Sequence, residues 1–139
     1  MKKIFLDSDV LLDLLLAREP FIDDITRIVE GSLSSNIKLC VSSITVINID
    51  YIIGRLETQN KAKTLRKKLL KIIYVENVGQ SIISKASDSK FRDFEDAVQN
   101  YCAEESGHRI IITRNTKDYK ESNLAIFTPK EYLAKIQTK

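Results

Sequence analysis

The stretch IFLDSDVLLDLLL, residues 4–16, is an almost unbroken apolar run that is interrupted by Asp7, Asp9 and Asp13. Apolar residues of this kind belong in a hydrophobic core, where an unpaired carboxylate is costly to bury. The fold must therefore bring hydrogen-bond donors, cations or water to these three acids. We expect Asp9 to lie in the first turn of a helix, and Asp13 to point to solvent or to a surface ion pair.

The composition is that of an ordinary globular protein. Of the 139 residues, 43% are hydrophobic and 29% are charged, which predicts one domain over residues 1–139 with a sizeable core. The net charge of +3 permits a polyanionic partner without requiring one. No apolar run is long enough to cross a membrane, and acids break the N-terminal apolar stretch, so we expect a cytoplasmic protein.

Short, continuous apolar strands alternate with segments of helical length. This pattern is typical of a parallel sheet covered on both faces, and it predicts an α/β fold, a three-layer α/β/α sandwich with a mostly parallel central sheet. The expected strands are residues 3–6, 38–42, 73–78, 109–113 and 125–128. The expected helices are residues 10–17, 21–33, 44–57, 60–73, 80–87 and 93–106, followed by a last helix after Thr128.

Residues that start and stop helices support these boundaries. Ser42 or Ser43 can cap the helix at 44–57, and Gly107 can stop the helix at 93–106. Thr128-Pro129-Lys130-Glu131 has the pattern of a capping box with Pro at the first helical position. Gly31 or Asn36 is expected to end the helix that starts at residue 21.

Acidic residues recur at strand ends and helix starts. Asp7 follows the first strand, Asp93 and Asp96 begin a later helix, and Asp118 lies just beyond the next strand. Ligand sites in open α/β sheets lie at the carboxyl ends of the strands, so we expect Asp7, Asp96 and Asp118 to converge. Taken singly, Asp7 and Asp93 could be helix caps and Asp118 a turn residue. Their joint placement favours a site.

The chemistry of this acidic set suits a hard divalent cation. Clustered carboxylates raise one another's pKa unless a cation lies between them, and oxygen ligands suit Mg²⁺ or Mn²⁺. Such a metal activates water and stabilises the charge that develops on phosphate. The single His108 gives little support to a zinc site, and we expect Cys40 and Cys102 to be small, reduced core residues. No glycine loop for binding phosphates is present.

Three blocks of the sequence resemble the PIN-domain ribonucleases, specifically their VapC-like toxin branch. The blocks are residues 4–16 followed by REPF at 18–21, DFEDAVQNYCA at 93–103, and IITRNTKDY at 111–119. The resemblance implies a compact α/β/α domain that holds one or two Mg²⁺ or Mn²⁺ ions in an acidic pocket and cleaves RNA with metal-activated water. It also implies a toxin with an antitoxin partner and a homodimer.

The resemblance assigns roles to individual residues. Asp7 matches the first catalytic acid and metal ligand, and Asp96 matches the acid on the later helix. Asn115 or Asp118 stands where the family has its last acid. Five further residues are expected to support the pocket: Ser8, Asp9, Asn48, Asp93 and Thr113.

Asn48 departs from the family's pattern, which usually has Glu on the helix after the second strand. Asn can offer an oxygen to a metal but contributes no charge, and Asp50 lies roughly on the opposite helical face. A second interpretation is therefore an inactive PIN-like domain that binds RNA or protein. A third is a phosphatase of the haloacid-dehalogenase type, because FLDSDV fits that family's motif with Asp7 as nucleophile and Asp9 as acid/base. The short chain and its later acids argue against this third interpretation.

Cations that could contact RNA occur in two places. The segment at 60–73 carries six Lys and Arg residues and no acid, and Lys63, Lys67 and Lys71 follow one stripe of the expected helix. That face could equally be a solvated surface, or a dimer or antitoxin contact. Arg114 and Lys117 lie beside the expected metal site.

Overall fold

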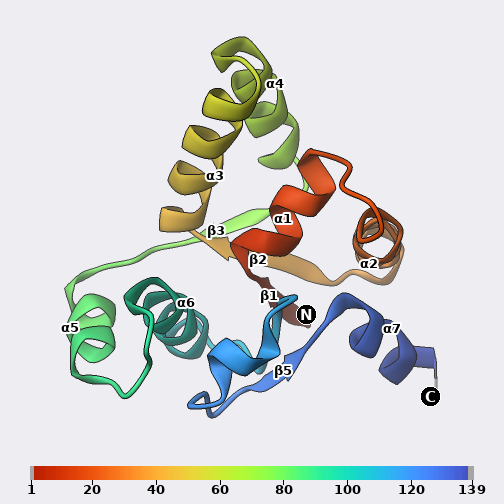
Figure 1. The fold of residues 1–139 in the computed structure, drawn as a ribbon. Coiled ribbons are helices and arrows are strands. Elements are labelled where there is room, and N and C mark those ends of the chain that lie inside the picture. Colours follow the sequence, from red (N-terminus) through yellow and green to blue (C-terminus); the bar gives the residue numbers. More distant parts are fainter. Residues whose placement is uncertain (1, 138–139) are drawn as a thin grey trace.

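The structure is a computed structural model that describes residues 2–137, in which one or two helices follow each strand (Figure 1). The strands are β1 (Lys3–Leu6), β2 (Lys38–Ser42), β3 (Tyr74–Glu76), β4 (Ile110–Ile112) and β5 (Ala125–Phe127). The α-helices are α1 (Ser8–Leu15), α2 (Ile22–Ser35), α3 (Ser43–Leu56), α4 (Gln59–Leu69), α5 (Gln80–Asp88), α6 (Phe94–Glu105) and α7 (Pro129–Gln137). A short 3₁₀ helix, η1 (Thr116–Tyr119), follows β4.

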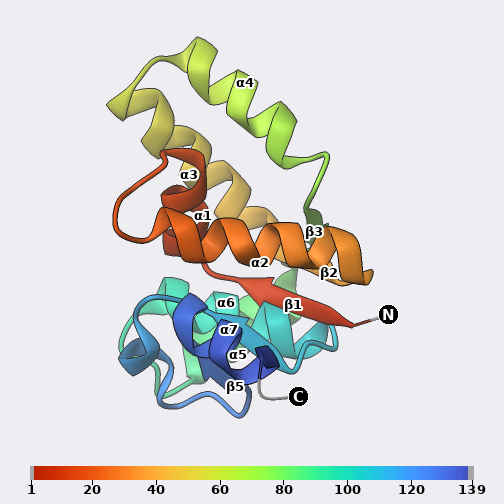
Figure 2. The same cartoon turned by 90° about the vertical axis from the view of Figure 1, so that its right-hand side faces the viewer.

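The strands form one sheet in the order β3-β2-β1-β4-β5, and all four pairings are parallel. β1 lies at its centre, and its side chains alternate between the two faces. Ile4 and Leu6 pack with α1, α2 and α3, whereas Phe5 packs with α5 and α6 on the other face (Figure 2). The three-layer α/β/α sandwich predicted from the sequence is thereby confirmed.

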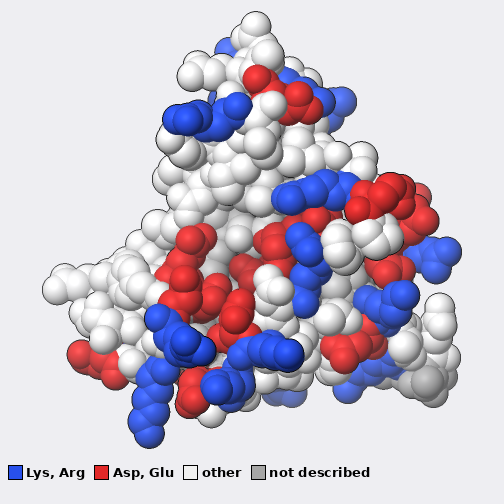
Figure 3. All heavy atoms as spheres, in the orientation of Figure 1, with Lys and Arg blue, Asp and Glu red and all other residues white. Residues whose placement is uncertain are grey.

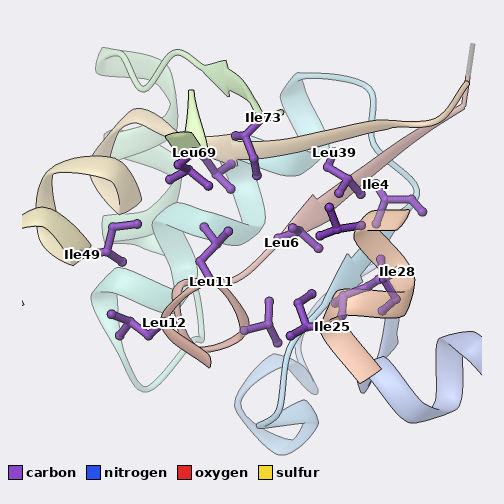
Figure 4. Packing of buried hydrophobic residues seen from close by; sticks show 14 of the residues in the cluster. Ile4, Leu6, Leu11, Leu12, Ile25, Ile28, Leu39, Ile49, Leu69 and Ile73 are labelled. Atoms are coloured by element: carbon purple, nitrogen blue, oxygen red, sulfur yellow. The ribbon is translucent and has the colours of Figure 1, made fainter. Parts of the chain in front are cut away.

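The larger core cluster fastens α1 and α2 to the sheet. Leu6 from β1, Leu11 from α1 and Ile25 from α2 are completely buried and converge in this cluster (Figure 4). Full burial of such a side chain contributes about 1.5–3 kcal/mol relative to exposure. The apolar residues of the opening run therefore hold α1 against the carboxyl end of β1, which is the end that carries Asp7.

Most elements begin and end close to the expected residues, and α4 shows the largest difference. The sequence predicts this helix to residue 73, but it ends at Leu69. After Leu69 the hydrogen bonds of the α-helix give way to those of a turn, in which the Lys71 and Ile72 N–H groups donate to the carbonyls three residues earlier. The resulting turn delivers Ile73 into the core and starts β3.

The helix caps lie where the sequence places them. Ser42 caps α3, and Thr128 and Glu131 exchange the two hydrogen bonds of a capping box. Asn36, in the left-handed conformation with φ of 57°, ends α2, while Gly31 lies inside that helix. Gly107 has φ of 82° and follows the end of α6. Within residues 2–137, no helix combines the length and apolarity needed to cross a bilayer.

The cap at Ser42 yields a test of the fold. Its buried hydroxyl accepts a hydrogen bond from the Thr45 N–H at 3.0 Å, so Ser42→Ala leaves this N–H unpaired at the start of α3. We expect the free energy of unfolding to fall by about 1–2 kcal/mol, measured by urea denaturation. Ser34→Ala, on the exposed surface of α2, is the control and should change it by less than about 0.5 kcal/mol. Equal stability of the two variants would contradict the cap.

Candidate active site

Asp7 lies directly after the central strand and is only 7% exposed. Its backbone N–H donates to the Ile112 carbonyl at 2.9 Å, which continues the pairing of β1 with β4. Its carboxylate accepts from the Ser8 N–H at 2.8 Å and from the Thr113 hydroxyl at 2.9 Å. Asp7 therefore caps α1, which is the role that its position alone predicted, but it also faces the residues that follow β4.

Asp9, in the first turn of α1, fixes the loop after β4. One oxygen, Oδ2, accepts from the Thr113 hydroxyl at 3.2 Å, from the Arg114 N–H at 3.0 Å and from the Asn115 amide at 3.3 Å. The single Thr113 hydroxyl proton is shared between Asp7 and Asp9. Asp9 thus holds Thr113, Arg114 and Asn115 at the carboxyl edge of the sheet.

The N-terminus of α6 brings Asp96 to the same edge. Asp93 caps this helix, and its carboxylate accepts from the Asp96 N–H at 2.9 Å. Burial and the negative charges of Asp7, Asp93, Asp118 and Glu95 raise the pKa of Asp96 to about 7. Asp7 and Asp118 thus both lie near enough to Asp96 for their charges to act on it, and Asp118 lines the same groove as Asp96.

Asp7 is also held in an environment that disfavours its charge. Burial and the charge of Asp9 raise its pKa to about 6, although hydrogen bonds from Thr113 and Ser8 oppose the shift. Burial likewise raises the pKa of Asp9. The buried Tyr119 hydroxyl lies beside Asp7, and burial together with that charge raises the pKa of Tyr119. These residues form a group of closely spaced carboxylates, with the buried, neutral hydroxyl of Tyr119 next to Asp7.

Asn48 contacts Glu95, an acid that was not predicted from the sequence to belong to the site. Its amide donates to the Glu95 carboxylate at 3.1 Å, and Glu95 directly precedes Asp96 on α6. Asp50, in contrast, forms an ion pair with Arg66 of α4, away from the acids. Asn48 therefore contacts the first turn of α6, and the charge beside it that acts on Asp96 is that of Glu95.

The expectation for Asp13 is wrong. Its side chain is 1% exposed and points inward, where it pairs with the Arg114 guanidinium at 2.7 Å and with Arg18 at 3.4 Å. The Arg114 guanidinium also lies 4.0 Å from the centre of the Phe21 ring. Because both arginines come from loops, the helical pattern of α1 alone could not reveal them. Arg114 therefore pairs with a buried acid of the protein itself, although its side chain is still 28% exposed.

A groove of about 490 Å³ opens beside the acids and combines both signs of charge. Asp93, Asp96 and Asp118 line it together with Lys117. Three exposed cations that the sequence argument did not select also line it: Lys90, Arg92 and Lys120. Figure 3 shows acidic side chains at the middle of this face with basic ones directly below them. Adjacency in sequence to Asp93 and Asp118 was the available signal for these cations.

The basic face of α4 lies elsewhere. Lys63 and Lys67 are exposed on α4, and Lys71 is exposed in the turn that follows it. The α3–α4 hairpin projects from the opposite end of the molecule to η1 (Figures 1 and 2). These three lysines therefore do not line the groove beside the acids.

The donor set fits a hard divalent cation. The carboxylates of Asp7, Asp96 and Asp118 are oxygen ligands, and Asn115 adds an amide on the same loop. The other oxygen of Asp9, Oδ1, is buried and has no hydrogen-bond partner among the described residues, which favours a cation close by. A cation there would also offset the repulsion that raises the pKa of Asp96.

This chain is similar to known proteins in both sequence and structure. Ribonuclease VapC1 of Aquifex aeolicus (strain VF5) is 22% identical over 142 residues, covering 99% of this chain and 97% of the relative. The DNA-bound VapBC from Salmonella typhimurium has a TM-score of 0.73 at 14% identity, covering 93% of this chain and 99% of that chain. Mycobacterium tuberculosis VapC20, a Sarcin-Ricin loop cleaving toxin, has a TM-score of 0.62 at 17% identity, with coverages of 78% and 86%.

A family model gives the assignment. The model described as PIN domain matches residues 3–117, a range that begins with β1 and extends into η1. It includes Asp7, Asp9 and Asp96 and therefore most of the acidic site. The solved structures add that the fold is shared over almost the whole chain. The chain belongs to the PIN-domain family.

Proposed function

We propose that this chain is an endoribonuclease that depends on Mg²⁺ or Mn²⁺, and that it is the toxin of a toxin–antitoxin pair in the cytoplasm. The main support is the placement of Asp7, Asp96 and Asp118 at the carboxyl edge of a parallel sheet, where the charges of Asp7 and Asp118 act on Asp96. The PIN-domain assignment and the names of the relatives, Ribonuclease VapC1 and several VapBC complexes, support the same activity.

The acids and the amide of Asn115 are the residues that would hold the metal. When bound there, a divalent cation supplies an activated water and stabilises negative charge on a phosphate. Asp7 is fixed for this task by two donors, the Ser8 N–H and the Thr113 hydroxyl. Asp93 holds the first turn of α6 and with it the position of Asp96.

The cations of the groove would bind the RNA backbone beside the acids. Lys117 and Lys120 are exposed at and after η1, and Lys90 and Arg92 are exposed before α6. Contacts between cations and phosphate position a nucleic acid without reading its sequence. The arrangement accounts for how a polyanion could approach a pocket full of carboxylates.

Asn48 favours a second candidate, an inactive PIN-like domain that binds RNA or protein. This candidate predicts RNA binding without cleavage in either metal. The phosphatase alternative has less support, because Oδ2 of Asp9 accepts from three donors of the loop after β4 and Oδ1 is buried, a poor arrangement for an acid/base that must exchange protons with substrate. A covalent aspartyl-phosphate on Asp7 would nevertheless identify it.

Partners of this chain would use its exposed apolar surface. Ile47 and Tyr51 lie one helical turn apart on α3, 67% and 64% exposed, and Leu56 at its end is 64% exposed. A groove of about 540 Å³ between α3 and α4 is lined by Ile47 and Tyr51. We assign this surface to an antitoxin, consistent with the VapBC complexes among the structural neighbours, and we expect the chain to form homodimers.

Removing one acid should abolish cleavage. We expect Asp7→Asn and Asp96→Asn each to slow Mn²⁺- or Mg²⁺-dependent cleavage of structured RNA by at least about 100-fold, because a charged metal ligand is lost. Chelation should stop cleavage by the parent. Asp23→Asn, on the first turn of α2, is the control and should cleave like the parent. Full activity of either site variant would refute the nuclease assignment.

The crowded carboxylates also predict how stability depends on pH without metal. Asp96 has a pKa of about 7 and Asp7 of about 6 in the folded protein, against 3.8 for the ordinary group. Between pH 4 and 7 the folded state therefore holds more protons than the unfolded state, so stability falls as pH rises through this window. Asp96→Asn should show a smaller fall and be at least as stable as the parent at pH 8.

Thermal melts in a chelator at pH 4.5 and pH 8 measure this difference. Asp88→Asn, at the exposed end of α5, is the control and should retain the fall seen in the parent. Addition of Mg²⁺ at pH 8 should raise the melting temperature of the parent more than that of Asp96→Asn. A parent that becomes more stable towards pH 8 without metal would contradict the described electrostatics.

The position of the RNA can be read from salt dependence. Changing Lys117 and Lys120 to Gln removes two cations of the groove, and each lost phosphate contact makes the slope of log affinity against log salt shallower by about 0.7. We expect a decrease of about 1.4 when binding is measured without divalent ions. The triple change of Lys63, Lys67 and Lys71 to Gln should leave the slope unaltered. The reverse result would place the RNA along α4.

A further inference from the structure

A second group of metal-ligating side chains lies on the face of the sheet that α5 and α6 cover. Cys40 on β2, Glu76 at the end of β3 and His108 before β4 each offer one ligand atom, and these atoms lie within 4.8 Å of one another. Glu76 is paired in register with Ser42, two residues after Cys40, so both side chains point to the same face. The sheet thus assembles three residues that are far apart in sequence.

The histidine of this group is buried and incompletely bonded. His108 is 3% exposed, and its Nε2 lies 2.6 Å from a carboxylate oxygen of Glu76. Its other nitrogen, Nδ1, is buried and has no hydrogen-bond partner among residues 2–137. Burial lowers the pKa of His108 and so favours the neutral ring, which keeps one lone pair. The nitrogen beside Glu76 is Nε2, so a cation between these two residues would take the Nε2 lone pair and leave the ring proton on the unpartnered Nδ1. The edge of this ring contacts Phe5, with 5.4 Å between ring centres, which holds its orientation.

The sulfur of Cys40 is available as well. Cys40 is a free cysteine and 1% exposed. Burial and the nearby charge of Glu76 raise the pKa of its thiol to about 11, so without a cation the sulfur stays protonated. Glu76 is half-buried, with a side chain 22% exposed, so the group borders solvent at this residue.

The charges around this group differ from those around the acidic pocket. Glu76, Lys3 and Lys38 act on Cys40, whereas Asp7, Asp93, Asp118 and Glu95 act on Asp96. The ligand atoms differ in kind too, because the acidic pocket offers oxygen alone. A metal bound at one place would therefore have a different spectroscopic signature from a metal bound at the other.

We propose that Cys40, Glu76 and His108 form a binding site for Zn²⁺, separate from the acidic pocket. Sulfur, imidazole nitrogen and carboxylate oxygen are the ligands that zinc takes in proteins, and a site with three protein ligands leaves a fourth position for water. Tetrahedral zinc spaces such ligands about 3.3–3.6 Å apart. The Glu76–His108 pair, now at 2.6 Å, would therefore open slightly when zinc binds. Binding converts the Cys40 thiol to a thiolate and releases its proton to solvent.

Cobalt replaces zinc as a visible probe in the test. The full chain, under reducing conditions and with excess Mg²⁺ to occupy the acidic pocket, is titrated with Co²⁺. We expect a thiolate-to-cobalt charge-transfer band in the near ultraviolet that saturates at one equivalent and bleaches when Zn²⁺ is added. Cys40→Ser should lose the band. Glu76→Gln, which keeps a hydrogen-bonding partner for His108, should weaken cobalt affinity at least 10-fold without unfolding the chain.

Cys102 provides the matched control. It is also buried and free, and it lies close enough for Glu76 and Cys40 to influence its pKa, but its sulfur contacts the Asn77 carbonyl at 3.7 Å. Cys102→Ser should therefore keep the cobalt band. Absence of a thiolate band in folded protein with excess Co²⁺, or a band that survives Cys40→Ser, would overturn the proposal. Neither result bears on RNA cleavage at the acidic pocket.

Discussion

The burial of Asp7 at the end of the central strand is the constraint on which the rest of the site depends. Both helical layers pack on β1, so the residue that follows it is desolvated whatever its identity. The Thr113 hydroxyl and the Ser8 N–H compensate this burial in part, yet the pKa of Asp7 remains about 6. The loop after β4 and the start of α6 then bring further carboxylates to the same edge. The fold thus holds several carboxylates close together although their negative charges repel one another. A divalent cation between them would offset this repulsion.

The contact between Asn48 and Glu95 brings a negative charge close to Asp96, although the residue on α3 is itself uncharged. The family resemblance leads us to expect an acid on α3, and α3 carries an amide there. That amide binds the carboxylate of Glu95, which is one of the charges that raise the pKa of Asp96. Ser42 and Thr45 fix the start of α3 and therefore the height at which Asn48 meets α6. Asn48 of α3 thus contributes through its position beside Glu95 and not through a charge of its own.

The sequence predicted the parts of the molecule that follow local rules. Apolar strands, helix caps and acids at strand ends were foreseeable, because periodicity and position in the chain determine them. Asp13 was placed wrongly since its partners Arg18 and Arg114 come from loops. The groove cations Lys90 and Lys120 were overlooked because only the fold shows that they border the acids. The grouping of Cys40 with His108 depends on sheet register and on burial, which a motif search based on spacing does not contain.

Arg114 connects the active-site loop to the interior of the protein. Its backbone N–H binds Asp9, and its side chain neutralises the buried Asp13. If the loop moved outward, Asp13 would keep only the longer contact with Arg18, and loss of a partner from a buried ion pair costs of the order of 3 kcal/mol. The acids in the opening apolar run thus have a mechanical consequence. They tie the loop after β4 to α1 from within, so that outward movement of this loop would break a buried ion pair.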